Sequence, residues 1–221
     1  MKRVINLDNW NRKEHFKFFS ALDDPFWGIT TTVDFTSIYQ QSKNMEVSFF
    51  LYSVHFLLKC INATTAFKLR IENGEVVEYD KINISPTIGR EDGTFGFGFF
   101  EYDTDLSLFI ENAEKEIHRV KNSTGLSFSK DTARADVIRY SALPWFAFSE
   151  MKHAGSIQTG DSIPKISTGK LIQEKKKLLL PISISVHHGL VDGRNVAEFI
   201  QNVKDCLLYT SPSPRDMRRS R

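Results

Sequence analysis

The chain has 221 residues, 41% of them hydrophobic and 25% charged, and its formal net charge is +2. These values exclude a disordered or collagen-like chain and are typical of one large globular domain. Residues 206–221 carry four Arg and one Asp, a net charge of +3, which leaves −1 for the first 205 residues. This near-neutral body argues against a nucleic-acid-binding surface.

Cysteine content and apolar runs indicate the compartment. Cys60 and Cys206 are too few for a disulfide framework and have no metal-ligand spacing, so we expect no metal site. The N-terminus lacks the apolar run of a signal peptide. The longest uncharged apolar stretch, residues 47–58, is too short to span a bilayer. We therefore expect a cytoplasmic protein without membrane contact.

The predicted elements mix helices and strands without a regular alternation. Asp8 or Asn9 is expected to cap a short first helix, and the pair Asn73-Gly74 predicts a hairpin. This pattern favours a single α/β domain: a two-layer sandwich with a mixed, largely antiparallel sheet and flanking helices. We predict strands over residues 27–35, 67–72, 75–79, 83–89, 95–100, 137–143, 166–173 and 178–186, and helices over 8–20, 47–61, 104–120 and from 192 or 193 onward.

The C-terminal segment differs in composition from the rest of the chain. A Ser/Pro run over residues 208–216 interrupts the amphipathic pattern, and three further Arg follow it. The segment looks like a translated sequencing adaptor or an expression scar. We therefore predict one domain over residues 1–205 and an artefactual tail over residues 206–221.

The motif HHGLVDG, residues 187–193, lies between a β-rich stretch and a helix-like stretch. Histidine accepts a proton near neutral pH and is the most common general base. Strand alternation places His188 on the same face as Ile184 and Val186, so we expect His188 to point into the molecule. From this spacing alone, a catalytic base and two ordinary polar residues at a strand end are equally good interpretations.

Four segments in matching order resemble a known family. HHGLVDG resembles the HHxxxDG signature of CoA-dependent acyltransferases. Residues 9–16 (NWNRKEHF), 141–145 (SALPW) and 168–170 followed by 178–181 resemble segments of the chloramphenicol acetyltransferases. The resemblance covers roughly residues 4–205 and implies a chloramphenicol acetyltransferase-like fold.

The resemblance also implies roles for individual residues. His188 would be the general base that takes the proton of a substrate hydroxyl as its oxygen attacks the thioester of acetyl-CoA. Ser141 would donate a hydrogen bond to the tetrahedral oxyanion. Asp192 would pair with Arg12 and so hold the loop that carries His188.

Two further residues and the oligomeric state follow from the same resemblance. Ser167 stands where the family has a Thr that helps to bind the intermediate through water, and Lys170 matches a lysine near the CoA phosphates. The resemblance implies a homotrimer with sites at the subunit interfaces, with acetyl-CoA and a chloramphenicol-like hydroxyl compound as substrates and no metal.

The resemblance is weakest around the acceptor pocket. Phe97 stands where a small residue is usual, and Trp27 adds bulk, which normally lowers affinity for the original ligand. Chloramphenicol is the favoured acceptor, but an acyltransferase for another alcohol or amine and a non-catalytic trimeric scaffold both remain open. The predicted pocket residues are Phe26, Trp27, Ile29, Thr31, Phe95 and Phe97.

Overall fold

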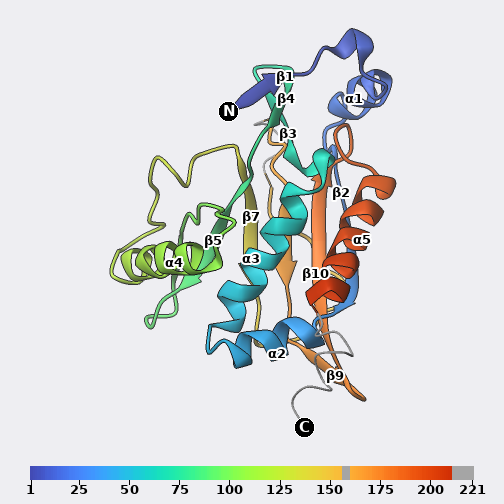
Figure 1. Ribbon diagram of the computed structural model, residues 1–221. Coiled ribbons are helices and arrows are strands. Elements are labelled where there is room, and N and C mark those ends of the chain that lie inside the picture. Colours follow the sequence, from blue (N-terminus) through green and yellow to red (C-terminus); the bar gives the residue numbers. More distant parts are fainter. Residues whose placement is uncertain (156–159, 211–221) are drawn as a thin grey trace.

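A mixed β-sheet with helices on one face forms the body of the molecule (Figure 1). The computed structural model describes residues 1–155 and 160–210, with side chains up to residue 207. The strands are β1 (Lys2–Val4), β2 (Phe26–Asp34), β3 (Leu69–Glu72), β4 (Glu75–Tyr79), β5 (Asn83–Gly89), β6 (Phe95–Phe97), β7 (Val137–Ala142), β8 (Lys165–Thr168), β9 (Ile172–Glu174) and β10 (Lys177–His187).

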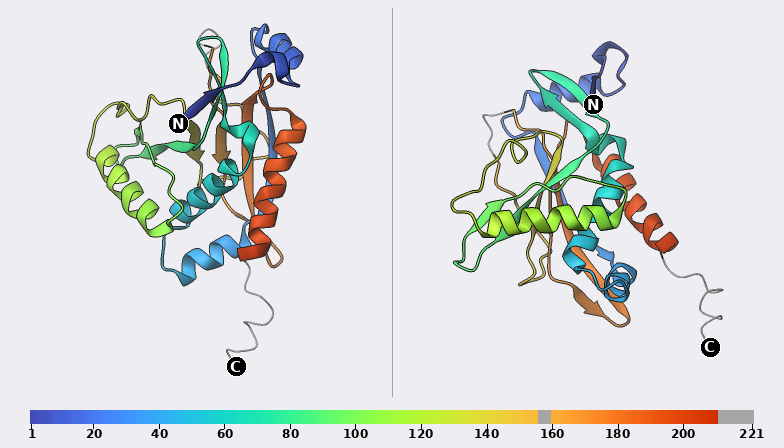
Figure 2. Two further views of the ribbon diagram at one scale, coloured as in Figure 1. Left: turned by 45° about the horizontal axis from the view of Figure 1, so that its top comes forward. Right: turned by 60° about the vertical axis from the view of Figure 1, so that its left-hand side comes forward.

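Helices α3 and α5 pack against each other over the sheet, as Figures 1 and 2 show. Helix α2 lies at one end of this layer, and α4 continues it over β5 and β6. The α-helices are α1 (Lys13–Ser20), α2 (Thr36–Asn44), α3 (Phe49–Asn62), α4 (Leu106–Lys121) and α5 (Gly193–Thr210), and 3-10 turns cover Leu7–Asn9 and Thr65–Lys68.

The larger sheet has the strand order β2-β10-β8-β7-β5-β6, with β9 paired to β10. Strand β10 is antiparallel to β2, β8 and β9, whereas β7 is parallel to both of its neighbours, β8 and β5. Strands β1, β4 and β3 form a separate antiparallel sheet. The mixed, largely antiparallel architecture predicted from the sequence is thus confirmed.

The two faces of the larger sheet differ in polarity, as β10 shows. Ile182, Ile184 and Val186 are fully buried in the core under the helices. Ser183 and His187 alternate with them and lie on the opposite face. The apolar face therefore stabilises the fold, and the polar face offers groups for a functional site.

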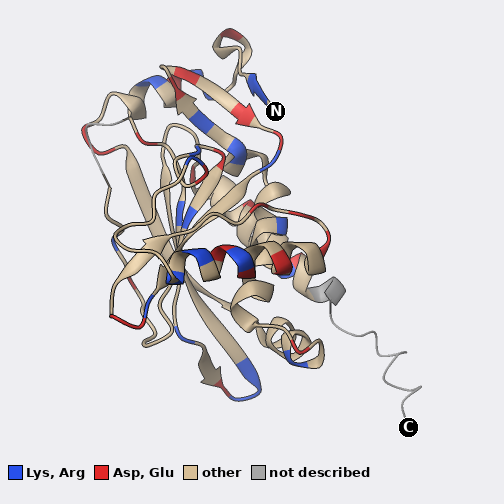
Figure 3. Ribbon diagram, turned by 90° about the vertical axis from the view of Figure 1, so that its left-hand side faces the viewer, with Lys and Arg blue, Asp and Glu red and all other residues tan. Residues whose placement is uncertain are grey.

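Helix α4 illustrates how the sequence determines local structure. The Asp105 side chain accepts hydrogen bonds from the N–H groups of Ser107 and Leu108, which caps the first turn. Charges of both signs share its outer face (Figure 3), where Glu111 and Lys115 form an ion pair of 2.6 Å. The expected amphipathic helix in this region is present, one to two residues later than predicted.

Several predicted boundaries are wrong for physical reasons. The predicted strand over residues 166–173 is two strands, because the backbone N–H of Lys170 turns away to the carbonyl of Phe146 (2.9 Å). The predicted strand over 95–100 ends at residue 97. The first α-helix starts at residue 13, and Asn6 caps the preceding 3-10 turn in place of Asp8 or Asn9. Helix α2 was not predicted.

The predicted hairpin at Asn73-Gly74 is confirmed, with φ values of 51° and 80° at the two turn residues. The predicted boundary after residue 205 falls inside α5, and Leu207 is only 8% exposed. Residues 211–221 lie outside the described residues, so the artefactual tail stays a prediction. Within residues 1–155 and 160–210, no helix combines the length and the apolar content that crossing a membrane requires.

Candidate active site

His188 follows directly on the end of β10. Its backbone N–H donates to the carbonyl of Pro25 (2.8 Å). Its ring stacks on Phe19, with centroids 3.8 Å apart and planes 4° from parallel, and Trp27 lies 5.4 Å away. The side chain is half-buried, and its Nδ1 is buried without a hydrogen-bond partner among the described residues. Aromatic packing therefore sets the plane of this imidazole.

The neighbouring His187 is the more buried of the two histidines, at 3% exposure. Because β10 ends at His187, strand alternation does not extend to His188, and the parity argument for an inward-pointing His188 stays a prediction. Burial lowers the pKa of His187 to about 4; nearby His188 adds to this shift and Asp161 opposes it. His187 is therefore neutral at neutral pH, and its Nδ1 accepts the N–H of Gly189 (3.2 Å).

Arg12, at the start of α1, connects the histidine turn to α5. Its guanidinium donates to the carboxylate of Asp192 and, through Nη2, to the carbonyl of His188 (3.2 Å). Asp192 Oδ1 also accepts the N–H groups of Arg194 (2.9 Å) and Asn195 (3.1 Å), which caps α5. Burial raises the pKa of Asp192, but the hydrogen bonds from Arg12 and from the α5 backbone outweigh it, and the net pKa is lowered.

A row of hydroxyl groups crosses the polar face of the sheet. Ser183 of β10, Ser167 of β8 and Ser141 of β7 are register partners on three adjacent strands. Thr87 of β5 continues the row, with its Oγ1 3.2 Å from the Oγ of Ser141. Ser167 is fully buried, and its Oγ lies 2.9 Å from Nε2 of His153. Two of the residues predicted for the site, Ser141 and Ser167, are thus neighbours.

Two cavities open on this face, with volumes of about 520 Å³ and about 470 Å³. The first is lined by three of the predicted acceptor residues, Phe26, Trp27 and Ile29, together with His187. The second contains Ser141, Ser167 and the predicted acceptor residue Phe97. Lys152, His153 and Lys165 belong to both linings and so separate the two spaces.

Besides His188, Arg12 and Asp192, three predicted residues line neither of these cavities. Thr31 lies in β2, where its register partner on β10 is Ile182. Phe95 is 47% exposed and packs edge-on against Phe97, with ring centroids 5.7 Å apart. Lys170 is an exposed residue in the turn between β8 and β9.

The structure also places residues in the cavities that the sequence did not indicate. His153 comes from the segment after β7, where no periodicity marks it, and its pKa is lowered by burial and by the charge of Lys165. Lys165 is 5% exposed and forms ion pairs with Asp161, which also pairs with Arg139. The sequence offered one indication of these cavity residues: Lys165 precedes Ser167 by two positions, and residues two apart in a strand lie on the same face.

The predicted catalytic groups form two separate sets within the chain. His188, Arg12 and Asp192 lie at the turn between β10 and α5, whereas Ser141 and Ser167 lie in the second cavity. His188 lines neither of the two cavities. Among the described residues, no three His, Cys, Asp or Glu side chains gather so that they could hold a metal ion.

Comparison with known proteins identifies the family. The family model described as chloramphenicol acetyltransferase matches residues 2–204. The chain belongs to the chloramphenicol acetyltransferase family. Chloramphenicol acetyltransferase 3 of Escherichia coli is 27% identical over 202 residues, covering 91% of this chain and 94% of the relative. The chloramphenicol acetyltransferase of Clostridioides difficile is 28% identical, covering 93% and 96%.

Solved structures agree with this assignment. A chloramphenicol acetyltransferase superposes with a TM-score of 0.86 at 30% identity, covering 94% of this chain and 100% of that chain. A probable dihydrolipoamide acetyltransferase from Listeria monocytogenes shares the fold, with a TM-score of 0.67 at 12% identity over 96% of this chain and 97% of that chain. The chain is therefore an acyltransferase of a family that uses acetyl-CoA as co-substrate.

Proposed function

We propose that this protein transfers the acetyl group of acetyl-CoA to a hydroxyl of chloramphenicol or a related acceptor. Support comes from the family match over residues 2–204 and from one feature of the structure. That feature is the contact of Arg12 with both Asp192 and the backbone carbonyl of His188. It holds the turn that carries a half-buried histidine in one position, as a general base requires.

In the proposed reaction, Nε2 of His188 takes the proton of the acceptor hydroxyl while the hydroxyl oxygen bonds to the thioester carbon. The resulting oxyanion accepts a hydrogen bond from Ser141, and one such donor is worth about 3 kcal/mol. The carbon–sulfur bond then breaks, and the proton passes from His188 to the thiolate of CoA. The products are an acetyl ester and free CoA, without an acyl-enzyme.

The remaining site residues take supporting roles in this proposal. Ser167, buried beside Ser141, hydrogen-bonds the intermediate through water, and His153 holds its hydroxyl. Lys170, exposed at the β8–β9 turn, contacts the phosphates of acetyl-CoA. We also place the protein in the cytoplasm, because two cysteines are too few for the disulfide framework of a secreted domain.

We further propose a homotrimer in which the His188 set of one subunit faces the Ser141 cavity of the next. The separation of the two sets within one chain supports this arrangement. Large apolar side chains are also exposed, with Trp145 at 73%, Phe128 at 71% and Phe146 at 52%. Such side chains gain stability when a partner surface covers them. Light scattering should give a mass about three times 25.4 kDa, and a monomer that turns over would contradict the proposal.

The function is tested by following thiol release from acetyl-CoA in the presence of chloramphenicol. We expect wild-type protein to release thiol and His188→Ala to release none above the uncatalysed rate. His15→Ala, a substitution of an exposed histidine on α1, is the matched control and should retain activity. A variant ending at Asp205 shows whether the C-terminal segment affects the rate.

Two results would change the proposal. Release with other alcohols but not with chloramphenicol would keep the mechanism and replace the acceptor. No release with any hydroxyl or amine compound, from a correctly folded trimer, would favour the non-catalytic scaffold.

A further inference from the structure

Lys165 is a buried cation in the wall between the two cavities. Its residue exposure is 5%, although it lies on the polar face of β8, and it lines both cavities. Its Nζ lies 3.3 Å from Oδ2 of Asp161 and 4.1 Å from the centroid of the Phe26 ring. An ammonium has three N–H donors, so one carboxylate and one ring leave part of its capacity for a ligand.

In the lining of the second cavity positive charge exceeds negative charge, whereas Asp24, Glu150 and Asp161 line the first cavity together with Lys152 and Lys165. Asp161 also pairs with Arg139, whose Nη1 lies 2.9 Å from its Oδ2, so one carboxylate serves two cations. Lys165 and Arg139 are register partners on adjacent strands. Lys152 adds a third cation to the second cavity, and no Asp or Glu occurs among the described residues lining it. A buried cation without full compensation is costly, and a bound anion offsets that cost.

Neutral polar groups surround these cations. Burial and the charge of Lys165 lower the pKa of His153, so this ring is neutral at neutral pH and holds the hydroxyl of Ser167. The cavity thus contains hydroxyl groups at one position and excess positive charge at another. This is the polarity that a ligand with a hydroxyl and an anionic group requires.

The spacing of the two positions follows from the sheet. Lys165 and Arg139 each precede a residue of the hydroxyl row, Ser167 and Ser141, by two positions on the same strand. Two residues along a strand span about 6.6 Å, and side chains two apart lie on one face. A hydroxyl bound beside Ser141 therefore lies about 6.6 Å from the cations, roughly the length of an aromatic ring.

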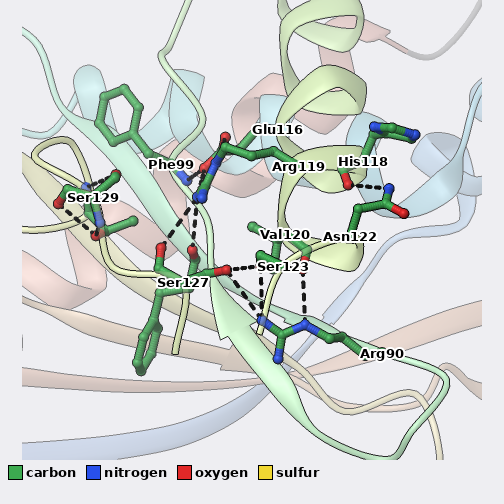
Figure 4. Close-up of polar contacts among 12 residues, drawn as sticks. Arg90, Phe99, Glu116, His118, Arg119, Val120, Asn122, Ser123, Ser127 and Ser129 are labelled. Carbon is green, nitrogen blue, oxygen red and sulfur yellow. Dashed lines mark hydrogen bonds and ion pairs between the residues drawn. The ribbon is translucent and has the colours of Figure 1, made fainter. Parts of the chain in front are cut away.

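An aromatic wall borders the same cavity. The rings of Phe97 and Phe128 stack with centroids 5.4 Å apart and planes 19° from parallel. Phe128 belongs to the segment after α4, which side-chain hydrogen bonds hold in place (Figure 4). Arg90 donates to the Oγ atoms of Ser123 (3.1 Å) and Ser127 (3.2 Å). The segment that carries Phe128 is thus held in place, and a flat apolar ligand body fits against the stacked rings.

We propose that the acceptor is a hydroxy acid whose carboxylate binds Lys165 and Arg139 while its hydroxyl lies beside Ser141. This inference rests on the proposed acetyl transfer and names the substrate class of that site. The hydroxyl oxygen receives the acetyl group as described above, and the carboxylate is unchanged. Chloramphenicol, which carries no anionic group, would then be a weaker acceptor than a hydroxy acid of similar size.

Two matched acceptors test the inference. 4-(Hydroxymethyl)benzoate and its methyl ester carry the same primary hydroxyl at the same distance along the ring, and only the acid is charged. For wild-type protein we expect kcat/KM for the acid to exceed that for the ester at least tenfold. Equilibrium binding of both compounds, measured by calorimetry without acetyl-CoA, should show the same preference, and this arm does not depend on turnover.

Three variants distinguish the effect of these cations on acceptor preference from general effects on folding. Lys165→Met removes the charge and keeps an unbranched side chain one atom shorter, and Arg139→Gln changes a side chain that is 50% exposed and therefore tolerant. Each should lower the preference for the acid at least fivefold. Lys81→Gln removes an exposed lysine that is ion-paired with Glu101, and it should leave the preference unchanged.

The outcomes distinguish this inference from the proposed function. Two results overturn the hydroxy-acid inference alone. One is thiol release with the same kcat/KM for the acid and the ester. The other is calorimetry that shows equal binding of the two compounds, or binding of neither. A raised KM for acetyl-CoA in Lys165→Met and Arg139→Gln, with the acceptor preference unchanged, would assign the cations to the CoA phosphates and also overturn it. Selective binding of the acid without any thiol release would support the anion site and contradict the proposed acetyl transfer.

Discussion

Replacing Asp192 by Asn should weaken the turn that carries His188 without removing the cap of α5. The amide oxygen of Asn still accepts the N–H groups of Arg194 and Asn195, because Asn and Asp are equally good N-cap residues. What is lost is the negative charge that binds the Arg12 guanidinium. Asp192→Ala removes both the charge and the cap, so the pair of variants separates the two contributions.

The size of the effect follows from the exposure of the two partners. Hydrogen bonds to charged groups contribute about 1.5–3 kcal/mol. The Arg12 side chain is 15% exposed and that of Asp192 33%, which places this pair at the lower end of that range because water screens it. We expect Asp192→Asn to lower the free energy of unfolding by about 1.5–2 kcal/mol. Asp192→Ala should cost about 1 kcal/mol more, the usual contribution of an N-cap.

Urea unfolding at one fixed protein concentration measures these losses. A double-mutant cycle with Arg12→Met isolates the coupling between the two side chains. Because Arg12 also holds the backbone of His188, kcat should fall on the order of 100-fold in Asp192→Asn, the usual cost of misplacing a catalytic group by about 1 Å. A coupling energy below about 0.5 kcal/mol, or unchanged kcat, would refute this role for the ion pair.

Three further changes have defined outcomes. Ser141→Ala should lower kcat by about 100- to 1000-fold with little change in KM, if Ser141 binds the oxyanion; steady-state kinetics measure both. The pKa of His187 falls from 6.5 to about 4 on folding, so the unfolded state binds more protons between these pH values. The free energy of unfolding therefore decreases as the pH drops from 6.5 to 4. His187→Gln should flatten this decrease, as measured by urea titrations at several pH values. In Gly96→Ala, the new Cβ would meet Cγ1 of the buried Val120 at 2.8 Å and Cβ of Ser127 at 2.9 Å, and overpacking should cost about 1–3 kcal/mol in thermal unfolding. Gly89→Ala, with no atom within 4 Å, is the matched control.

Local patterns in the sequence predicted most of the elements. The Asn73-Gly74 hairpin and the apolar helix over residues 47–61 follow from turn chemistry and periodicity, which depend on neighbouring residues only. The motif over 187–193 indicated where a strand ends and a helix begins, and β10 and α5 meet there. Errors occur where tertiary contacts outweigh local preference, as at Lys170, whose N–H leaves the strand ladder for the carbonyl of Phe146.

The arrangement of the site depends on the sheet. Ser141 and Ser167 are 26 positions apart in the chain, yet the parallel pairing of β7 and β8 places them side by side. The same pairing joins Lys165 to Arg139, which no spacing along the chain indicates. Sequence patterns thus specify the elements and the family, whereas strand register and strand ends determine which side chains meet, because these depend on contacts between distant segments.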